Sequence, residues 1–172
     1  QRQMCIRDRL DLCRMVVCLI LKVDKPLFLF AIYIYRYNNT AGIDLIGFFL
    51  ISQFSFGFEF FHCHQSKIHQ ADKFVIMRHD VEYSVDRAYA LAKVESSMDF
   101  TSTFFFQWTN NSYNILSRRN QDLIKDMHER GHVIGLHYAL NGLTDMQEVR
   151  HQIKKEMDIL SEMFGFPITQ FS

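Results

Sequence analysis

The sequence predicts an α/β fold with parallel strands, carried by residues 74–172. Three observations lead to this prediction. Short apolar runs alternate with segments of helical period, polar capping residues precede those segments, and glycine or proline follows two of them. Strands that alternate with helices are typically parallel and joined by right-handed crossovers. A barrel and an open sheet both satisfy this pattern.

The first strand is predicted over the apolar residues 74–77. A helix is expected to follow Ser84, because a serine hydroxyl accepts a hydrogen bond from an early helical amide. The second strand is predicted over residues 101–106, which are mainly β-branched and aromatic. The apolar face of the intervening helix contains Val85, Ala88, Leu91, Ala92 and Val94.

The second helix is expected to begin at Ser117 or Asn120 and to end before Gly131, a residue type common just after helices. The third strand is predicted over residues 132–136. A third helix should begin at Thr144, since Gln147 three residues later completes a capping box. The inward positions of these two helices are Leu123, Ile124 and Met127, then Met146, Val149, Ile153, Met157, Leu160 and Phe164.

Gly165 and Pro167 end the third helix, and residues 168–171 look like the beginning of a fourth strand. Residues 1–73 follow no comparable pattern. Residues 1–9 read QRQMCIRDR, which matches the translation of a transposase-type sequencing adapter and is left out of the fold prediction; the alternative is a basic tail.

Residues 10–43 contain two apolar runs that lack a dependable period and are too short to span a bilayer, so no membrane segment is expected. They are interpreted either as native sequence or as a non-native or disordered segment. The alternating phenylalanines of residues 54–60 predict a half-buried strand. The cluster of His62, Cys63, His64 and His69 invites a zinc interpretation, but a second cysteine pair is lacking, so a polar loop is favoured.

The composition narrows the range of functions. The chain has 19 basic and 19 acidic residues, which argues against a general binder of nucleic acid or anionic membranes. A hydrophobic content of 48% excludes a disordered chain. We expect a cytoplasmic protein, because no cysteine follows Cys63 and no signal peptide is readable.

Polar side chains follow the first and third strands. Asp80 and Glu82 come after the first strand and His137 after the third, and the carboxyl ends of parallel strands meet at one edge. A D-x-E sequence in extended backbone directs both carboxylates to the same side. Two carboxylates and an imidazole suit a divalent metal of the zinc, manganese, cobalt or iron type. The alternative is that Asp80 only satisfies backbone amides.

Two motifs resemble those of the polysaccharide deacetylase-like (NodB-homology) family. Residues 78–84 read RHDVEYS, similar to its R-H-D-V-D-x-S motif, and residues 131–138 read GHVIGLHY, similar to G-H-E-I-G-x-H. The resemblance implies an irregular (β/α)7 barrel, of which residues 44–172 would be a partial domain, namely its N-terminal part truncated at the C-terminus. It also implies metal-dependent removal of N-acetyl or similar acyl groups from a surface polysaccharide or its sugar precursor.

Carried over to this sequence, the resemblance makes Asp80 the catalytic base, Glu82 and His137 ligands of a zinc or similar ion, and a carbohydrate the partner. Two departures matter: Glu82 replaces an aspartate, and Asn141 stands where the family has a second metal histidine. An amide is a poor zinc ligand. A non-catalytic homologue that binds glycan or a partner, or a different metal hydrolase, is therefore the alternative.

Further residues lie near the expected site. Arg78 and His79 precede Asp80, and His79 is expected either to orient that carboxylate or to pack. Trp108 and Tyr138 follow the second and third strands and would either stack on a sugar ring or pack at the rim. His132 begins the third strand, at the opposite end from this site, and is interpreted as structural.

Overall fold

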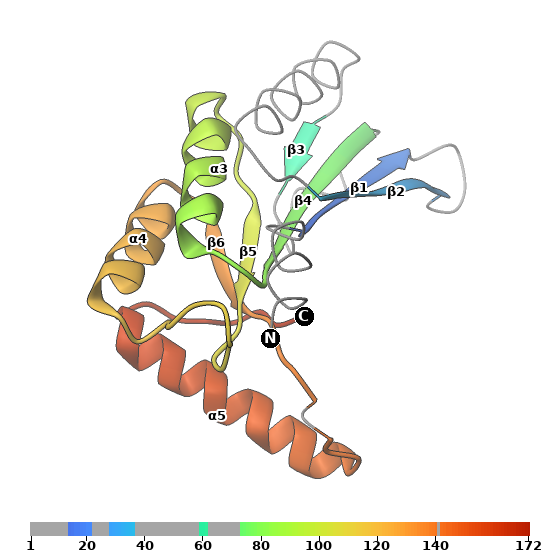
Figure 1. Cartoon of the computed structure of the whole chain (residues 1–172). Coiled ribbons are helices and arrows are strands. Elements are labelled where there is room, and N and C mark those ends of the chain that lie inside the picture. The colour runs from blue at the N-terminus through green and yellow to red at the C-terminus, as the bar shows by residue number, and fades with distance from the viewer. Residues whose placement is uncertain (1–13, 22–27, 37–58, 62–72, 141) are drawn as a thin grey trace, which may run out of the picture.

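The computed structural model describes residues 14–21, 28–36, 59–61, 73–140 and 142–172 (Figure 1). Predictions for the sequence outside these ranges, including the adapter-like residues, most of the phenylalanine alternation, the Cys/His cluster and Asn141, lie outside the described residues. The described strands form one sheet in the order β2-β1-β4-β5-β6, and β3 also pairs with β4.

The predicted parallel strands are confirmed in the second half of the chain. Strands β4 (Lys73–Val81), β5 (Thr103–Phe106) and β6 (Val133–Leu136) are parallel neighbours, and the short β3 (Glu59–Phe61) is parallel to β4. Residues 168–171, expected to begin another strand, approach β6, with a parallel bridge between Leu136 and Phe171. The alternation of strand and helix therefore gives the mixed α/β arrangement that the sequence predicts.

Two further strands occur where the sequence shows no dependable period. Strands β1 (Arg14–Leu21) and β2 (Phe28–Arg36) pair with each other antiparallel, and β1 also pairs antiparallel with β4. The register places Arg14 opposite Asp80. The parallel arrangement is thus confined to β3, β4, β5 and β6 among the described strands.

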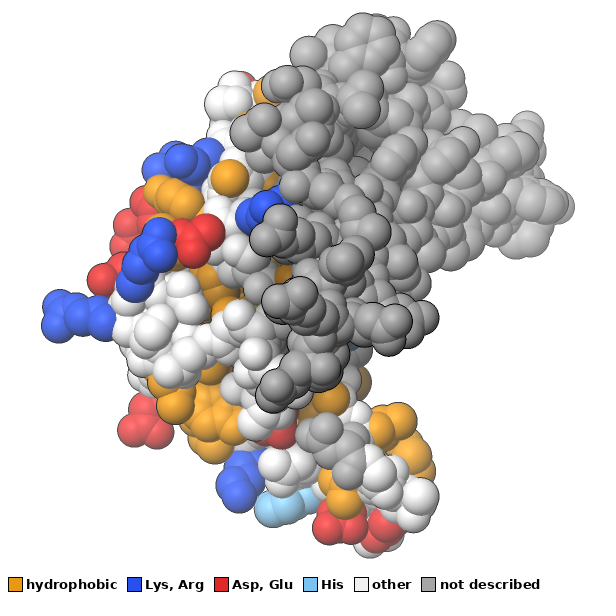
Figure 2. All heavy atoms as spheres, viewed as in Figure 1, with side chains coloured by type: hydrophobic (Ala, Val, Ile, Leu, Met, Phe, Trp, Pro, Cys, Tyr) orange, Lys and Arg blue, Asp and Glu red, His pale blue; other side chains and the backbone are white. Residues whose placement is uncertain are grey.

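In the described part of the chain, three helices lie against the parallel strands. Helix α3 (Val85–Ser97) packs against α4 (Arg118–Glu129), and α5 (Met146–Phe164) contacts β6 and crosses the end of the strands (Figure 1). Within the described residues no helix is both long and apolar enough to cross a membrane. Figure 2 shows charges of both signs interspersed over this side of the molecule rather than gathered by sign.

The predicted helix starts are confirmed for α3 and α4 and wrong for α5. Ser84 accepts a hydrogen bond from the Arg87 amide, and Ser117 caps α4 in the same way. Helix α5 is capped by Asp145, whose Oδ1 accepts from the Gln147 amide at 3.0 Å. The helix therefore begins one residue later than expected, at Met146, and this residue, expected inward, is 61% exposed.

The apolar core lies between the sheet and the helices, and Phe104 and Phe106 of β5 are fully buried in it. Strand β4 continues four residues beyond its predicted end at residue 77, because its backbone pairs with β1 and β5 through the polar positions. Alternation along this extension sends His79 toward α3, whereas Arg78 and Asp80 lie on the opposite face. The polar positions of β4 therefore serve two different sites.

Candidate functional site at the ends of β4 and β6

Asp80 is held by its neighbour on the same face of β4. Arg78 donates from Nε to Oδ1 at 2.9 Å and from Nη2 to Oδ2 at 3.0 Å, a two-pronged ion pair. Asp80 is only 6% exposed, and the Arg78 guanidinium lies 5.0 Å from the centre of the Phe105 ring. Arg78 thus fixes the orientation of the Asp80 carboxylate at the buried end of the strand.

Glu82 and His137 meet, as their places after β4 and β6 predict. The His137 Nε2 atom lies 3.6 Å from Glu82 Oε1, and both side chains are partly exposed. The backbone amide of His137 donates to the Phe106 carbonyl at 2.8 Å, which anchors this position beside β5. The other ring nitrogen, Nδ1, lies 3.0 Å from the Ser172 hydroxyl.

The separation between Glu82 and His137 has a chemical meaning. A distance of 3.6 Å exceeds a hydrogen bond. Two ligands bound tetrahedrally to one zinc at about 2.1 Å would lie about 3.4 Å apart. If His137 Nδ1 carries the proton and donates to Ser172, Nε2 presents a lone pair to the carboxylate. A cation or a second proton would then hold these two acceptors together.

Glu82 and His137 are two suitable metal ligands, one fewer than a catalytic zinc site requires. Catalytic zinc takes three protein ligands. Among the described residues no group of three or more His, Cys, Asp or Glu side chains is placed to hold a metal, because Asp80 faces Arg78 instead of joining the pair. Asn141 lies outside the described residues. Glu82 and His137 therefore fit a metal as two ligands of a larger set.

His79 does not orient Asp80, which corrects one of the two roles considered for it. Its side chain is fully buried on the other face of β4, where Nε2 lies 2.7 Å from Glu95 Oε1. His132, interpreted as structural, is also buried and contacts the same region. These two histidines belong to the packing of α3 on the sheet.

The aromatic candidates occupy the rim. Trp108, two residues after the end of β5, and Tyr138, two residues after the end of β6, are both partly buried against the core. Burial, with Glu156 and Glu148 nearby, raises the pKa of the Tyr138 hydroxyl. The Tyr138 amide donates to the Ser172 carbonyl at 2.9 Å. Trp108 and Tyr138 are thus packed against the core on one side and only partly exposed.

Sequence reasoning missed two residues that join neighbouring strand ends. Asn110 donates from Nδ2 to the Glu82 carbonyl at 2.8 Å, and the Tyr113 hydroxyl donates to the Val81 carbonyl at 2.9 Å. Burial raises the pKa of Tyr113. No local signal announces these contacts, because asparagine and tyrosine are ordinary in a loop and their partners are backbone atoms about 30 residues away.

Comparison with known proteins adds no relative. No protein-family model matches the chain, and a search of curated proteins finds no match. The chemistry must therefore be inferred from the geometry, in which a carboxylate and an imidazole face each other beside a carboxylate held by arginine.

Proposed function

We propose that this chain carries part of the active site of a metal-dependent hydrolase that removes N-acetyl or similar acyl groups from a surface polysaccharide or its sugar precursor. The observation that carries the proposal is the facing pair of Glu82 and His137, 3.6 Å apart at the ends of two parallel strands. The resemblance of residues 78–84 and 131–138 to polysaccharide deacetylase motifs supports the substrate class.

The residues divide the chemistry between them. Glu82 and His137 would hold a divalent metal, which, when bound, polarises the amide carbonyl and lowers the pKa of water. Asp80 would accept the proton of the attacking water as general base. Arg78 keeps that carboxylate in one orientation through its two hydrogen bonds. If His137 Nδ1 donates to the Ser172 hydroxyl, 3.0 Å away, the Nε2 lone pair is left for the metal.

The proposed architecture is the irregular (β/α)7 barrel of that family. Strands β4, β5 and β6 with their crossover helices α3 and α4 fit its successive units, since each strand is parallel to the next. Site residues at the carboxyl ends of the strands agree with the general position of chemistry in such barrels.

Zinc titration of the whole chain, followed by calorimetry, tests the metal site. We expect His137→Ala and Glu82→Gln each to weaken zinc binding at least about tenfold, because each removes one ligand. His151→Ala is the matched control, since His151 is exposed on α5. Equal zinc affinity in the parent chain and in both site variants would refute the assignment. Likewise, unchanged acetate release by Asp80→Asn would remove that residue from the mechanism.

A second candidate is a non-catalytic homologue that binds glycan. It is favoured by the Arg78–Asp80 ion pair, because both oxygens of the intended base already accept hydrogen bonds. Acetate release from an N-acetylated oligosaccharide separates the two. Saturable oligosaccharide binding without any acetate release, in the presence of zinc, would favour the binding protein.

A further inference from the structure

The loop between β5 and α4 lines a shallow hollow that is open to solvent. This hollow has a volume of about 530 Å³ and is lined entirely by residues 108–116. Asn110, on its wall, donates from Nδ2 to the main-chain carbonyl of Glu82, which ties this loop to the residue whose side chain faces His137. The loop follows the carboxyl end of β5, the edge at which ligands bind in parallel α/β proteins.

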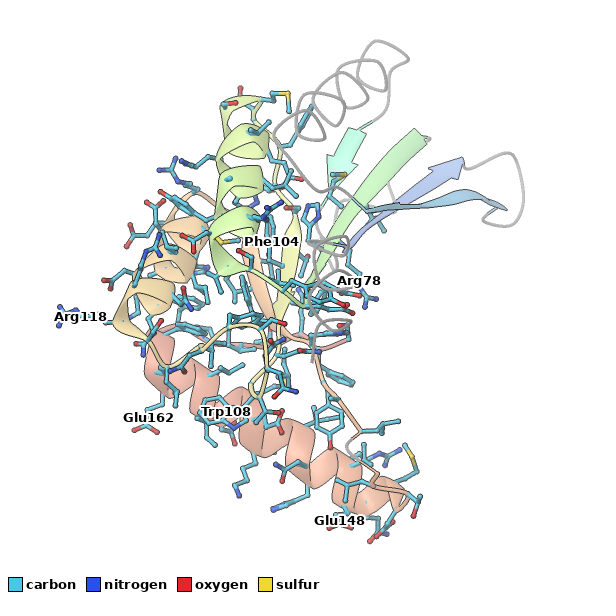
Figure 3. The ribbon with its side chains drawn as sticks, in the orientation of Figure 1. Arg78, Phe104, Trp108, Arg118, Glu148 and Glu162 are labelled. Carbon is cyan, nitrogen blue, oxygen red and sulfur yellow. The ribbon has the colours of Figure 1, made fainter. Side chains whose placement is uncertain are left out.

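The lining has an unusual chemical character. Residues 107–116 read QWTNNSYNIL, with aromatic, amide and hydroxyl side chains, two aliphatic residues at the end and no charged residue. Aromatic rings stack on the apolar face of a sugar, and amides and hydroxyls bond its hydroxyl groups. A phosphate or carboxylate would instead call for arginine or lysine. In Figure 3, Arg118 at the beginning of α4 points outward, away from Trp108.

The loop is held in shape before any ligand arrives. Asn110 Oδ1 accepts from the amides of Ser112 and Tyr113, and Asn114 Oδ1 accepts from the Leu116 amide. Asn120 of α4 donates to the Asn114 carbonyl at 2.8 Å. A preorganised loop loses little conformational entropy on binding, which favours a binding role over a simple connection.

Some polar side chains of the loop make no hydrogen bond within the described part of the chain. No hydrogen bond among the described residues engages the side chains of Trp108, Thr109 or Asn111, and Thr109 and Asn111 are exposed. The hydrogen bonds of Asn110 and Asn114 fix the shape of the loop. The side chains of Trp108, Thr109 and Asn111 are therefore available to contact a ligand. Trp108 is also the single tryptophan of the chain.

We infer that this hollow is a subsite for an uncharged sugar ring of the substrate, with Trp108 as the stacking surface and Thr109 and Asn111 as hydrogen-bonding groups. The inference rests on the proposed function and narrows its substrate to a neutral glycan, such as an unmodified N-acetylated oligomer. A sugar placed here would continue a chain whose acylated unit lies at Glu82 and His137.

Fluorescence of the single tryptophan tests the subsite directly. The whole chain is titrated with a neutral tetramer of N-acetylglucosamine in buffer containing EDTA, which separates binding from metal chemistry. We expect a saturable change in Trp108 emission, and about two- to tenfold weaker binding for Asn111→Ala, the effect of one lost hydrogen bond. Gln147→Ala, exposed on α5, is the control and should bind as the parent chain does.

Trp108→Ala, followed by calorimetry, should bind still more weakly, and circular dichroism would verify that the variant is folded. The inference is overturned if the tetramer leaves the emission unchanged, if Asn111→Ala binds as tightly as the parent chain, or if an oligouronate of equal length binds equally well. Saturable binding in EDTA, together with no acetate release in a parallel assay that contains zinc, would support the subsite and refute the hydrolase. Acetate release in the presence of zinc, with no change in Trp108 emission on titration, would support the hydrolase and refute the subsite.

Discussion

The Nε2 atom of His79 lies 2.7 Å from Oε1 of Glu95, and both side chains are completely buried. The second carboxylate oxygen accepts from the Ser102 hydroxyl at 2.6 Å, and that hydroxyl lies 3.1 Å from His132 Nδ1. The Ser102 amide donates to the same Nδ1 at 3.2 Å, so the His132 proton is on Nε2, facing the Ala92 carbonyl. A continuous buried polar chain thus joins α3 to the sheet.

Removing Glu95 should be among the most damaging single changes in the described part of the chain. Glu95→Ala leaves His79 and Ser102 without their shared acceptor, and each buried polar group left unsatisfied typically costs about 1–3 kcal/mol. Glu162→Ala, exposed on α5 (Figure 3), is the matched control and should cost less than about 0.5 kcal/mol. Urea unfolding measures both, and similar losses for the two variants would contradict the role of the buried chain.

Burial of His132 should make stability depend on pH. Burial lowers its pKa below the ordinary value of 6.5 and Arg130 and His79 act in the same direction, while Glu95 and the Ala92 carbonyl oppose the shift. The unfolded chain therefore binds a proton that the folded chain resists, and stability falls as the pH drops through 6.5.

The slope from this one group is at most about 1.4 kcal/mol per pH unit, with full stability retained above 6.5. Urea unfolding between about pH 5.5 and 7.5 should give a shallower slope for His132→Gln than for the parent chain. His151→Gln, exposed on α5, should keep the parent slope. A parent slope retained in His132→Gln would assign the pH dependence to other groups.

The elements predicted well are those whose signal is local. The apolar run at residues 74–77, the aromatic run of β5 and the periodicity of α4 each depend on neighbouring residues only, and each is present. The continuation of β4 through Arg78 and Asp80 was missed, because these polar positions are held in the sheet by pairing with β1 and β5. Strand pairing between segments distant in the sequence cannot be read from the local pattern of apolar and polar residues.

Some residues of the candidate site and its surroundings can be predicted from the sequence, and others cannot. Glu82 and His137 were expected to meet because both follow parallel strands, and they do. Glu95 was not recognised as buried, since a carboxylate on a helix is usually exposed and its partners, Ser102 and His79, lie 7 and 16 residues away. Only the folded chain brings His79 and Ser102 within hydrogen-bonding distance of the Glu95 carboxylate.

The displaced cap of α5 offers a test of structure against sequence pattern. Asp145 accepts from the Gln147 amide at 3.0 Å, whereas Thr144, the residue favoured by the pattern, is exposed. Asp145→Ala should therefore lower the free energy of unfolding by about 1 kcal/mol, and Thr144→Ala should change it by less than about 0.5 kcal/mol. Chemical denaturation of both variants decides between them, and the opposite ranking would restore the threonine cap.

Gly135 of β6 leaves room for the ring of Phe105, which lies opposite it in the sheet. A Cβ atom at this position would stand 2.5 and 2.6 Å from two ring carbons and 3.1 Å from the Gln170 carbonyl oxygen. The ring also lies under Arg78, so displacing it would disturb the partner of Asp80. Gly135→Ala should therefore cost about 1–3 kcal/mol through overcrowding.

A double-mutant cycle identifies the cause of that cost. Phe105→Leu removes the ring atoms that the new methyl group would meet, so the double variant should recover about 1 kcal/mol or more relative to additive losses. Gly165→Ala is the control, because its Cβ would meet nothing within 4 Å but its φ of +81° strains any other residue. Gly165→Ala should lower the free energy of unfolding by the same amount whether residue 105 is Phe or Leu. Strictly additive losses for Gly135→Ala and Phe105→Leu would show that contact with the Gln170 carbonyl, rather than with the ring, requires glycine in β6.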